Sequence, residues 1–449
     1  MVKFRIADYF YPWRILHWRR LLWRSQYYSD DEMHALQWEL LSRLLRHCFE
    51  NVAYYRRGFA EIGLHPSDLR RVDDLRLVPV INKRILLERY EEFKADNFER
   101  FRPREVHTSG TTGTPMSFYW DADSNVLELV CQWRHFSWSG YRLGEPFLDI
   151  RSRILDVPSG YVWNWKCRGL EVSSDNIDAA NVQRYAELLR KYRVKLWRGH
   201  PHAINWFCYL LHNAGIDDVK PKYVISCAET LMGYERDFIE SWSELRVCDN
   251  YGLKEHNALI HQCPEGEYHI ASEYGVVEII RDDGQAALPG EEGRIVATGL
   301  HNKAVPLLRY DTGDYAVQSD RRCSCGRTLP LVERITGRID DRVLRPDGKW
   351  VSGFQRVFCF AKGVQRAQLV QEQRESLNVY LVLGEGYAEQ TEIHLRTELK
   401  KKLGESMNIH FHRVKEIPFR SPGKSKLVVN KLGFDDGRVK ASANERTRI

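Results

Sequence analysis

Apolar residues recur at helical spacing in the N-terminal part of the chain. Between positions 36 and 49 they return every three or four residues: Leu36, Leu40, Leu41, Leu44, Leu45 and Phe49. This is the pattern of a helix that buries one face. Ser29 and Glu32 precede the run at the spacing of a capping box, in which each side chain accepts a hydrogen bond from the other residue's backbone N–H. The pattern predicts a helix from about residue 30 to 50.

Helical and strand-like segments alternate through the middle of the chain. Residues 181–192 have helical spacing, 194–197 have the pattern of a strand, a further helix ends near 215, and 223–226 form a short apolar run. Strands that alternate with helices pair in parallel, because each helix returns the chain to the same end of the sheet. We therefore predict an α/β fold with mixed and parallel sheets.

The pattern changes twice towards the C-terminus. Short β-rich segments at 274–280, 293–298 and 305–308 are separated by Gly, Pro and Asp, and strands at 367–371, 377–383 and 409–414 surround a helix at 390–403. We predict an N-terminal domain over 1–339, helical over 1–100 and β-rich over about 260–339. A small mobile α+β domain is expected over 340–435, followed by a polar tail, 436–449.

Composition narrows the class of protein. At 449 residues the chain is longer than one core supports, and 67 basic against 61 acidic residues leave a charge of +6, too small to indicate nucleic-acid binding. No apolar run has the length of a membrane span or signal peptide, and ten mostly isolated cysteines are typical of reduced thiols. We expect a cytoplasmic protein.

Residues 10–28 interleave tryptophan and leucine with arginine. This pattern predicts an amphipathic helix that packs on its own domain. Contact with a membrane surface or an anionic partner is the alternative.

A hydroxyl-rich loop, Thr108–Pro115, offers the clearest candidate chemistry. Its two glycines let backbone N–H groups converge, and its five hydroxyl groups add donors for phosphate oxygens. The loop predicts a nucleotide triphosphate site, with an ordinary flexible loop as the alternative. Gly113 is followed by Thr114 and Pro115 and not by the Lys-Ser/Thr of a P-loop, which disfavours a P-loop NTPase.

Four further segments follow in order: 250–255 (Asn-Tyr-Gly-Leu-Lys-Glu), 310–314 (Tyr-Asp-Thr-Gly-Asp), 337–341 (Gly-Arg-Ile-Asp-Asp) and 421–424 (Ser-Pro-Gly-Lys). With the hydroxyl-rich loop they resemble the adenylate-forming ligase superfamily, most closely its phenylacetate-CoA ligase/CapK branch, from near Ser29 to about Leu432. The resemblance implies ATP-dependent conversion of a carboxylate, aryl or related, to an acyl-adenylate, and transfer to an acceptor, most simply CoA. Alternatives are an adenylyltransferase, a ligase that modifies capsular polysaccharide or a cofactor, and a zinc-stapled module that binds an anionic polymer.

The resemblance also implies roles for individual residues. Lys424 would bridge carboxylate and phosphate, with Lys426 as the alternative, and Glu255 would hold Mg²⁺. The other implied roles are phosphate binding by Thr108, Ser109, Gly110, Thr111, Thr112 and Gly113; adenine binding by Ala228, Glu229, Asp249, Asn250 and Tyr251; ribose or phosphate contacts by Asp314 and Arg338; the acyl pocket at Trp133 and His200; and a hinge at Asp340. The sequence departs from the family at Thr114 and Met116, where a lysine is common beside the loop, and at Lys254, where Thr or Ser is usual.

Cysteine and histidine spacing suggests a metal site. Cys263 and His269 lie in one turn-rich segment, and Cys323 and Cys325 lie in another. Three thiolates and one imidazole suit a closed tetrahedral site for structural zinc. Unrelated thiols are the alternative, and His256 and His261 are possible substitutes for His269.

Overall fold

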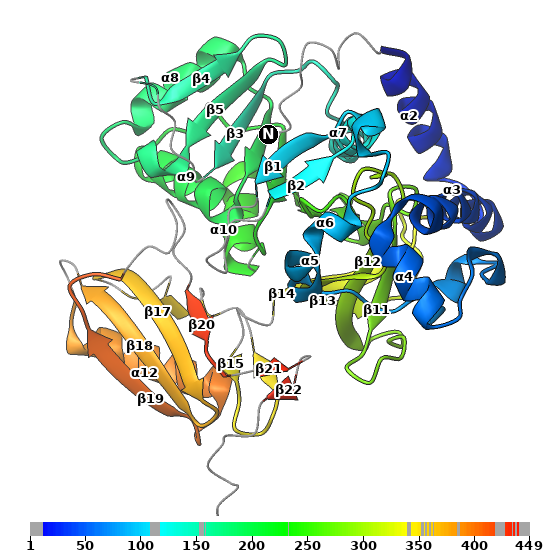
Figure 1. Cartoon of the computed structure of the whole chain (residues 1–449). Coiled ribbons are helices and arrows are strands. Elements are labelled where there is room, and N and C mark those ends of the chain that lie inside the picture. Colours follow the sequence, from blue (N-terminus) through cyan, green and yellow to red (C-terminus); the bar gives the residue numbers. More distant parts are fainter. Residues whose placement is uncertain are drawn as a thin grey trace, which may run out of the picture. The chain divides into compact units, whose positions relative to one another are not determined.

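The protein is described here from a computed structural model, which divides into two compact units, residues 1–335 and 336–449 (Figure 1). The structure describes residues 12–439 except 108–116, 152–156, 158, 232, 339–342, 352–353, 355–356, 359–360, 362, 384–386, 418–426, 433 and 436–437.

One long mixed sheet runs through the first unit. In sheet order its strands are β11 (Gly275–Ile280), β12 (Glu292–Gly299), β13 (Tyr310–Gln318), β14 (Leu331–Arg338), β10 (Tyr268–Ile270), β9 (Leu259–Gln262), β8 (Val247–Gly252), β7 (Tyr223–Cys227), β6 (Leu196–Gly199), β3 (Phe147–Arg151), β5 (Gly169–Ser173) and β4 (Tyr161–Asn164). The strands β8, β7, β6, β3 and β5 pair in parallel. The predicted α/β class with a mixed sheet is confirmed.

Helices bury both faces of the parallel part. Trp197, Val224 and Val247 belong to the core shared with α8 (Val182–Tyr192), α9 (Pro201–Asn213) and α10 (Gly233–Ser243), which Figure 1 shows beside β3, β4 and β5. The residues that alternate with them, Leu196, Ile225 and Cys248, belong to a second cluster that includes Phe136 of α7 (Ala122–Trp138). Burial on both faces explains why these strands are short, almost continuous apolar runs in the sequence.

The N-terminal part of the first unit is mainly helical. Its elements are α2 (Pro12–Ser25), α3 (Asp30–Asn51), α4 (Ala53–Glu61), the 3₁₀ helices at Pro66–Asp68, Val72–Leu77 and Phe98–Phe101, α5 (Lys83–Glu88), α6 (Tyr90–Phe93) and the hairpin β1 (Arg104–His107) with β2 (Ser117–Trp120). The capping box is present: Ser29 accepts from the backbone N–H of Glu32, which accepts in turn from that of Ser29. The predicted helix is therefore confirmed.

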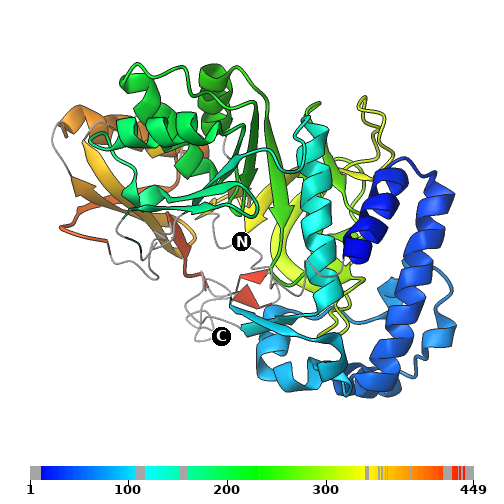
Figure 2. The same ribbon diagram turned by 90° about the horizontal axis from the view of Figure 1, so that it is seen from above.

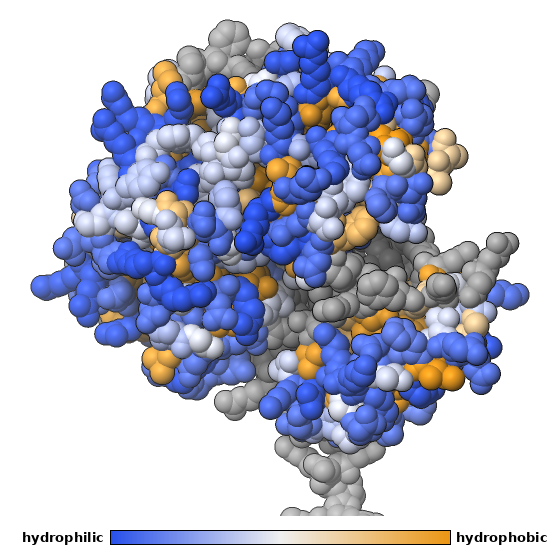
Figure 3. All heavy atoms as spheres, turned by 180° about the vertical axis from the view of Figure 1, so that it is seen from behind, coloured by the Kyte–Doolittle hydropathy of each residue, from blue (hydrophilic) through white to orange (hydrophobic). Residues whose placement is uncertain are grey.

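The arginine-rich helix α2 packs on its own unit, as predicted. It lies alongside α7 (Figure 2), where Leu22 is fully buried with Val126, Leu127 and Val130. No described helix is both long and apolar enough to cross a membrane. On the face drawn in Figure 3, hydrophobic residues are scattered among hydrophilic ones.

The strand predicted at 305–308 is wrong. Val305, Leu307 and Leu308 are buried, but their backbone is irregular and β13 begins only at Tyr310. Pro306 lacks the N–H that a strand ladder uses. The Tyr55 hydroxyl donates to the Pro306 carbonyl at 3.1 Å and accepts from the Leu308 N–H at 2.8 Å. This one side chain therefore makes backbone hydrogen bonds that a neighbouring strand would make in a sheet.

The second unit is a small α+β fold. A four-stranded sheet has the order β19 (Asn408–Arg413), β18 (Ser376–Leu383), β17 (Val364–Gln373) and β20 (Val428–Asn430), and a core of buried leucines joins it to α12 (Glu389–Leu403). Two small hairpins complete the described part: β15 (Val343–Leu344) with β16 (Trp350–Val351), and β21 (Phe434–Asp435) with β22 (Arg438–Val439). The strands and helix expected beyond residue 340 are present.

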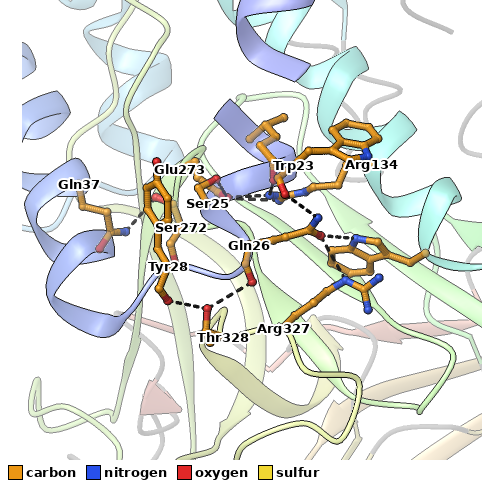
Figure 4. Close-up of polar contacts among 12 residues, drawn as sticks. Trp23, Ser25, Gln26, Tyr28, Gln37, Arg134, Ser272, Glu273, Arg327 and Thr328 are labelled. Carbon is orange, nitrogen blue, oxygen red and sulfur yellow. Dashed lines mark hydrogen bonds and ion pairs between the residues drawn. The ribbon is translucent and has the colours of Figure 1, made fainter. Parts of the chain in front are cut away.

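A buried ion pair joins the helical layer to the sheet half of the first unit (Figure 4). Arg134 of α7 lies 2.6 Å from a carboxylate oxygen of Glu273, and both side chains are fully buried. Ser25, at the end of α2, donates to the same carboxylate, and the Leu22 carbonyl accepts from Arg134. Burial opposes the charge of Arg134, but Glu273 more than offsets it and raises the pKa of the guanidinium. Neither charge can lose its partner without leaving the other uncompensated.

We predict that Glu273→Gln lowers the free energy of unfolding by about 3 to 5 kcal/mol, the usual cost of leaving one buried charge unpaired. Urea unfolding measures this loss. Asp218→Asn is the matched control, because Asp218 pairs with Arg190 at 2.7 Å on the surface, where solvent screens the charges and an ion pair contributes little to stability. Equal losses of unfolding free energy in the two variants would contradict the conclusion that the Arg134–Glu273 pair is buried and interdependent.

We also predict an acid-side loss of stability from His301. Its Nε2 lies 2.7 Å from the Glu273 carbonyl, and burial lowers the pKa of His301 to about 4. The unfolded chain takes up this proton near pH 6.5, so stability is lost as the pH falls from about 6.5 to about 4, by about 3 kcal/mol in total. In His301→Gln, which retains a side-chain N–H donor, unfolding free energy should fall less over this range. The exposed His34→Gln should keep the wild-type slope; identical slopes in all three proteins would exclude His301 as the cause.

Candidate functional site

The carboxyl ends of three adjacent parallel strands meet at one edge of the sheet. The strands β6, β7 and β8 end at Gly199, Cys227 and Gly252. Residues that follow such strands line the crevice in which open α/β sheets bind ligands. The predicted adenine and acyl residues that follow β6 and β7, and those that end β8, therefore belong to the same edge.

His200 and Glu229 lie close together there. His200 is the N-cap residue of α9, but its ring does not cap the helix; its Nδ1 lies 3.4 Å from one carboxylate oxygen of Glu229. Ala228 has φ +69°, in the left-handed region that costs a side-chain-bearing residue energy. This turn directly precedes Glu229. His202, which the sequence analysis did not single out, contacts the other oxygen of Glu229 through Nδ1 at 2.6 Å.

Asp249 is turned into the interior. Its carboxylate accepts from the Ser226 hydroxyl at 2.6 Å and from the Tyr268 hydroxyl at 3.1 Å, and burial raises the pKa of Asp249. These contacts tie β8 to β7 and to β10. Asp249 thus positions the next residues, Asn250 and Tyr251, and the sequence pattern carried no signal for its two hydroxyl partners.

Tyr251 connects the parallel part of the sheet to its β-rich part. Its hydroxyl donates to Asp314 of β13 at 2.9 Å, although β9, β10 and β14 separate β8 from β13 in the sheet. Asp314 is 6% exposed, and its N–H donates to the Thr312 hydroxyl at 3.1 Å across Gly313, which has φ +74°. The segments 250–255 and 310–314, distant in sequence, therefore meet.

The hairpin that flanks the hydroxyl-rich loop reaches the same region. Trp120, which ends β2, donates from Nε1 to the Lys254 carbonyl at 2.5 Å and stacks on His256 at 4.1 Å between ring centroids. The turn held in this way contains Glu255, which is half-buried, and Lys254, which is exposed. The strand that follows the loop thus contacts the turn that contains the predicted Mg²⁺ ligand, at the end of the hairpin farther from the loop, and the sequence did not indicate this contact.

The four predicted zinc ligands lie together. The sulfurs of Cys263 and Cys323 are 3.6 Å apart, Cys325 sulfur is 3.4 Å from His269 Nε2, and all four donor atoms lie within 4.8 Å of one another. The two substitutes considered for His269 lie elsewhere: His256 stacks on Trp120, and His261 stacks on His135 at 4.5 Å.

The aromatic residues of α7 divide between two surroundings. Trp133 packs at the margin of the cluster of Phe136, Tyr141 and Ile225. Trp138 lies edge-on to His269 at 5.5 Å, beside the cysteine and histidine cluster. The acyl pocket at Trp133 and His200 stays a prediction.

Several predicted residues lie outside the described part of the chain. They are Thr108, Ser109, Gly110, Thr111, Thr112, Gly113, Asp340, Lys424 and Lys426. Arg338 ends β14, and its side chain is not described.

Known sequences resemble both parts of the chain. Residues 343–431 match the CapK C-terminal domain family. The phenylacetate-coenzyme A ligase of Aromatoleum evansii is 26% identical over 426 residues, which cover 90% of this chain and 95% of that protein. The corresponding ligase of Thermus thermophilus is 27% identical over 70% of this chain and 72% of its own length. Protein CapK of Staphylococcus aureus is 25% identical over 73% of this chain and 74% of its own length.

The fold also has solved counterparts. A crystal structure of 2-hydroxyisobutyryl-CoA ligase in the postadenylation state, in complex with an acyl-AMP, superimposes with a TM-score of 0.70 over 91% of each chain at 17% identity. The sequence relatives, the matched C-terminal family and this shared fold agree. They support a place for this chain in the phenylacetate-CoA ligase/CapK branch of the adenylate-forming ligases, to which it is similar over most of its length.

Proposed function

We propose that this protein is an AMP-forming acid–thiol ligase that activates an aryl or related carboxylic acid with ATP and transfers the acyl group to coenzyme A. The observation that carries the proposal is the contact between Tyr251 and Asp314 at the carboxyl edge of the sheet. It joins the two segments proposed for adenine and ribose. Trp120, at the end of the strand that follows the hydroxyl-rich loop, contacts the turn that contains Glu255. The names of the sequence relatives support the acid and the acceptor.

The proposed reaction has two displacements. A carboxylate oxygen attacks the α-phosphorus of ATP, the bond to the β-phosphate oxygen breaks, and pyrophosphate leaves. The sulfur of CoA then attacks the acyl carbon, AMP leaves with the bonding oxygen, and the thiol proton passes to solvent. Because the first step joins two anions, cations and backbone N–H groups must stabilise its transition state.

The chain has groups suited to binding the ribose, the magnesium ion and the phosphates of ATP. Asp314 has the acidic acceptor needed by vicinal ribose hydroxyls, and Tyr251 holds that carboxylate in place. Glu255 has the oxygen ligand that Mg²⁺ prefers, and the ion would offset phosphate charge. The hydroxyl-rich loop supplies donors for phosphate oxygens, and Lys424 would contact both carboxylate and phosphate.

The acceptor must reach the carbonyl that Lys424 contacts during adenylation. One arrangement cannot serve both steps, so the proposal includes rotation of the C-terminal domain about Asp340. The chain divides into compact units between residues 335 and 336, which supports a pivot near this position.

Transfer of the adenylyl group itself is the second candidate, which the similarity to Protein CapK and to the CapK C-terminal family leaves open. A pyrophosphate-exchange screen over aryl, fatty and amino acids, followed by thioester detection with CoA, separates the candidates. A ligase releases AMP and forms a thioester, whereas an adenylyltransferase leaves AMP on the product. Absence of acid-dependent exchange across the whole panel would overturn the ligase proposal.

We predict that Lys424→Ala slows pyrophosphate exchange at least about a hundredfold while ATP binding weakens only modestly, because its charge is needed most in the transition state. Exchange kinetics and ATP calorimetry measure the two effects. Lys426→Ala is the matched control and should retain most activity. The reverse result would transfer the role to Lys426.

We also propose that Cys263, His269, Cys323 and Cys325 bind one structural zinc ion. Tetrahedral zinc, with bonds of about 2.3 Å to sulfur and about 2.0 Å to nitrogen, separates its ligands by about 3.5 to 3.8 Å. The distances of 3.6 and 3.4 Å between donor atoms fit this geometry. The ion would join the β9–β10 turn to the segment between β13 and β14.

We predict close to one zinc per chain in protein purified without chelator. Cys323→Ser should lose the ion and lower the melting temperature by several degrees, because the binding energy of a structural site contributes to folding. Cys167→Ser is the control, since Cys167 lies outside this cluster. Metal analysis by mass spectrometry tests both, and zinc-free wild-type protein would contradict the proposal.

A further inference from the structure

A second group of potential metal ligands lies at the carboxyl edge of the sheet, apart from the cysteines. One ring nitrogen each of His200 and His202 and a carboxylate oxygen of Glu229 lie within 4.8 Å of one another. His202 Nδ1 is 2.6 Å from one oxygen of Glu229, and His200 Nδ1 is 3.4 Å from the other. Two histidine rings thus face the two oxygens of one carboxylate, so three potential ligands point towards one another. A single surface ion pair brings together only two groups.

We propose that His200, His202 and Glu229 bind a divalent ion of the later first transition row, such as Co²⁺, Ni²⁺ or Zn²⁺. Two imidazoles and one carboxylate are the ligands that suit these ions, whereas Mg²⁺ prefers an all-oxygen shell. The carboxylate leaves one positive charge of the ion uncompensated, which an anionic or water ligand can share.

The fold prearranges these ligands on rigid elements. His200 and His202 flank Pro201, the first residue of α9, so the proline ring fixes the backbone between them. Glu229 follows the left-handed Ala228 at the end of β7, and β6 and β7 are paired in parallel. The three ligands therefore come from two adjacent strand ends, and ordering them costs little entropy.

The group is open to solvent on the side of His202 and closed on the side of His200. His202 is 48% exposed and Glu229 is 33% exposed, whereas His200 is 6% exposed. An ion can enter from the side of His202 and reach the buried ring.

The proposed ion lies on the segment that the proposed function assigns to adenine. Glu229 belongs to both, so the ion and the adenine ring compete. This consequence rests on the proposed function, whereas metal binding itself does not. A transition metal would then inhibit the enzyme at a site distinct from that of Mg²⁺.

Calorimetric titration of the zinc-containing protein with CoCl₂ tests the site. We expect one additional Co²⁺ per chain, with d–d absorption but no sulfur charge-transfer band, which separates it from the cysteine site. His202→Ala should weaken this binding at least tenfold. His212→Ala is the matched control, because His212 is exposed near the end of the same helix, and it should bind as the wild type does. Absence of the additional ion, or equal affinity in the two variants, would overturn the site.

Binding of adenosine, which lacks phosphates that would chelate cobalt, tests the competition. Saturating Co²⁺ should weaken adenosine binding at least fivefold in wild-type protein and much less in His202→Ala. Unchanged adenosine affinity in wild-type protein would overturn the competition. Lack of adenosine and ATP binding in metal-free buffer would instead count against the proposed function, because the cobalt titration does not depend on it.

Discussion

The parallel pairing of β6, β7 and β8 is the constraint on which the site depends. Parallel strands require helical connections, and helices on both faces leave only the strand ends open to a ligand. His200, Glu229 and Tyr251 therefore gather although more than fifty residues separate the first from the last. The same pairing buries Asp249, whose hydroxyl partners on β7 and β10 hold the end of β8 in position.

The sequence predicted elements well where one periodic pattern dominated. The helix at Asp30–Asn51 followed from its apolar stripe and capping box, and the short strands of the parallel sheet followed from their apolar runs. The error at 305–308 has a specific cause. Apolar residues at that position are buried, but the Tyr55 hydroxyl forms hydrogen bonds with their backbone. Because Tyr55 lies about 250 residues away in the chain, the local sequence pattern cannot indicate this contact.

The sequence allowed individual residues of the candidate site to be proposed, but not the contacts between them. Motif residues such as Asp314 and Glu255 could be named from the family resemblance, and the four proposed zinc ligands, which the structure brings together, from their spacing. The contacts that join the motifs could not be named. Trp120 to Lys254, Tyr251 to Asp314 and His202 to Glu229 all link segments that only the folded sheet brings together.

The buried contacts of the N-terminal helices also bear on how the chain is made. Ser25 bonds to Glu273, and Thr328 donates to the carbonyl of Tyr28 across 300 residues. A ribosome adds about 5 to 20 residues per second, so roughly 15 to 60 s separate the synthesis of these partners. Helix α2 can pack on α7 earlier in that interval, but the contacts of Ser25 and Tyr28 with Glu273 and Thr328 cannot form until its end. The earliest part of the chain is thus among the last to reach its final surroundings, and a chaperone that shields it would act before the sheet exists.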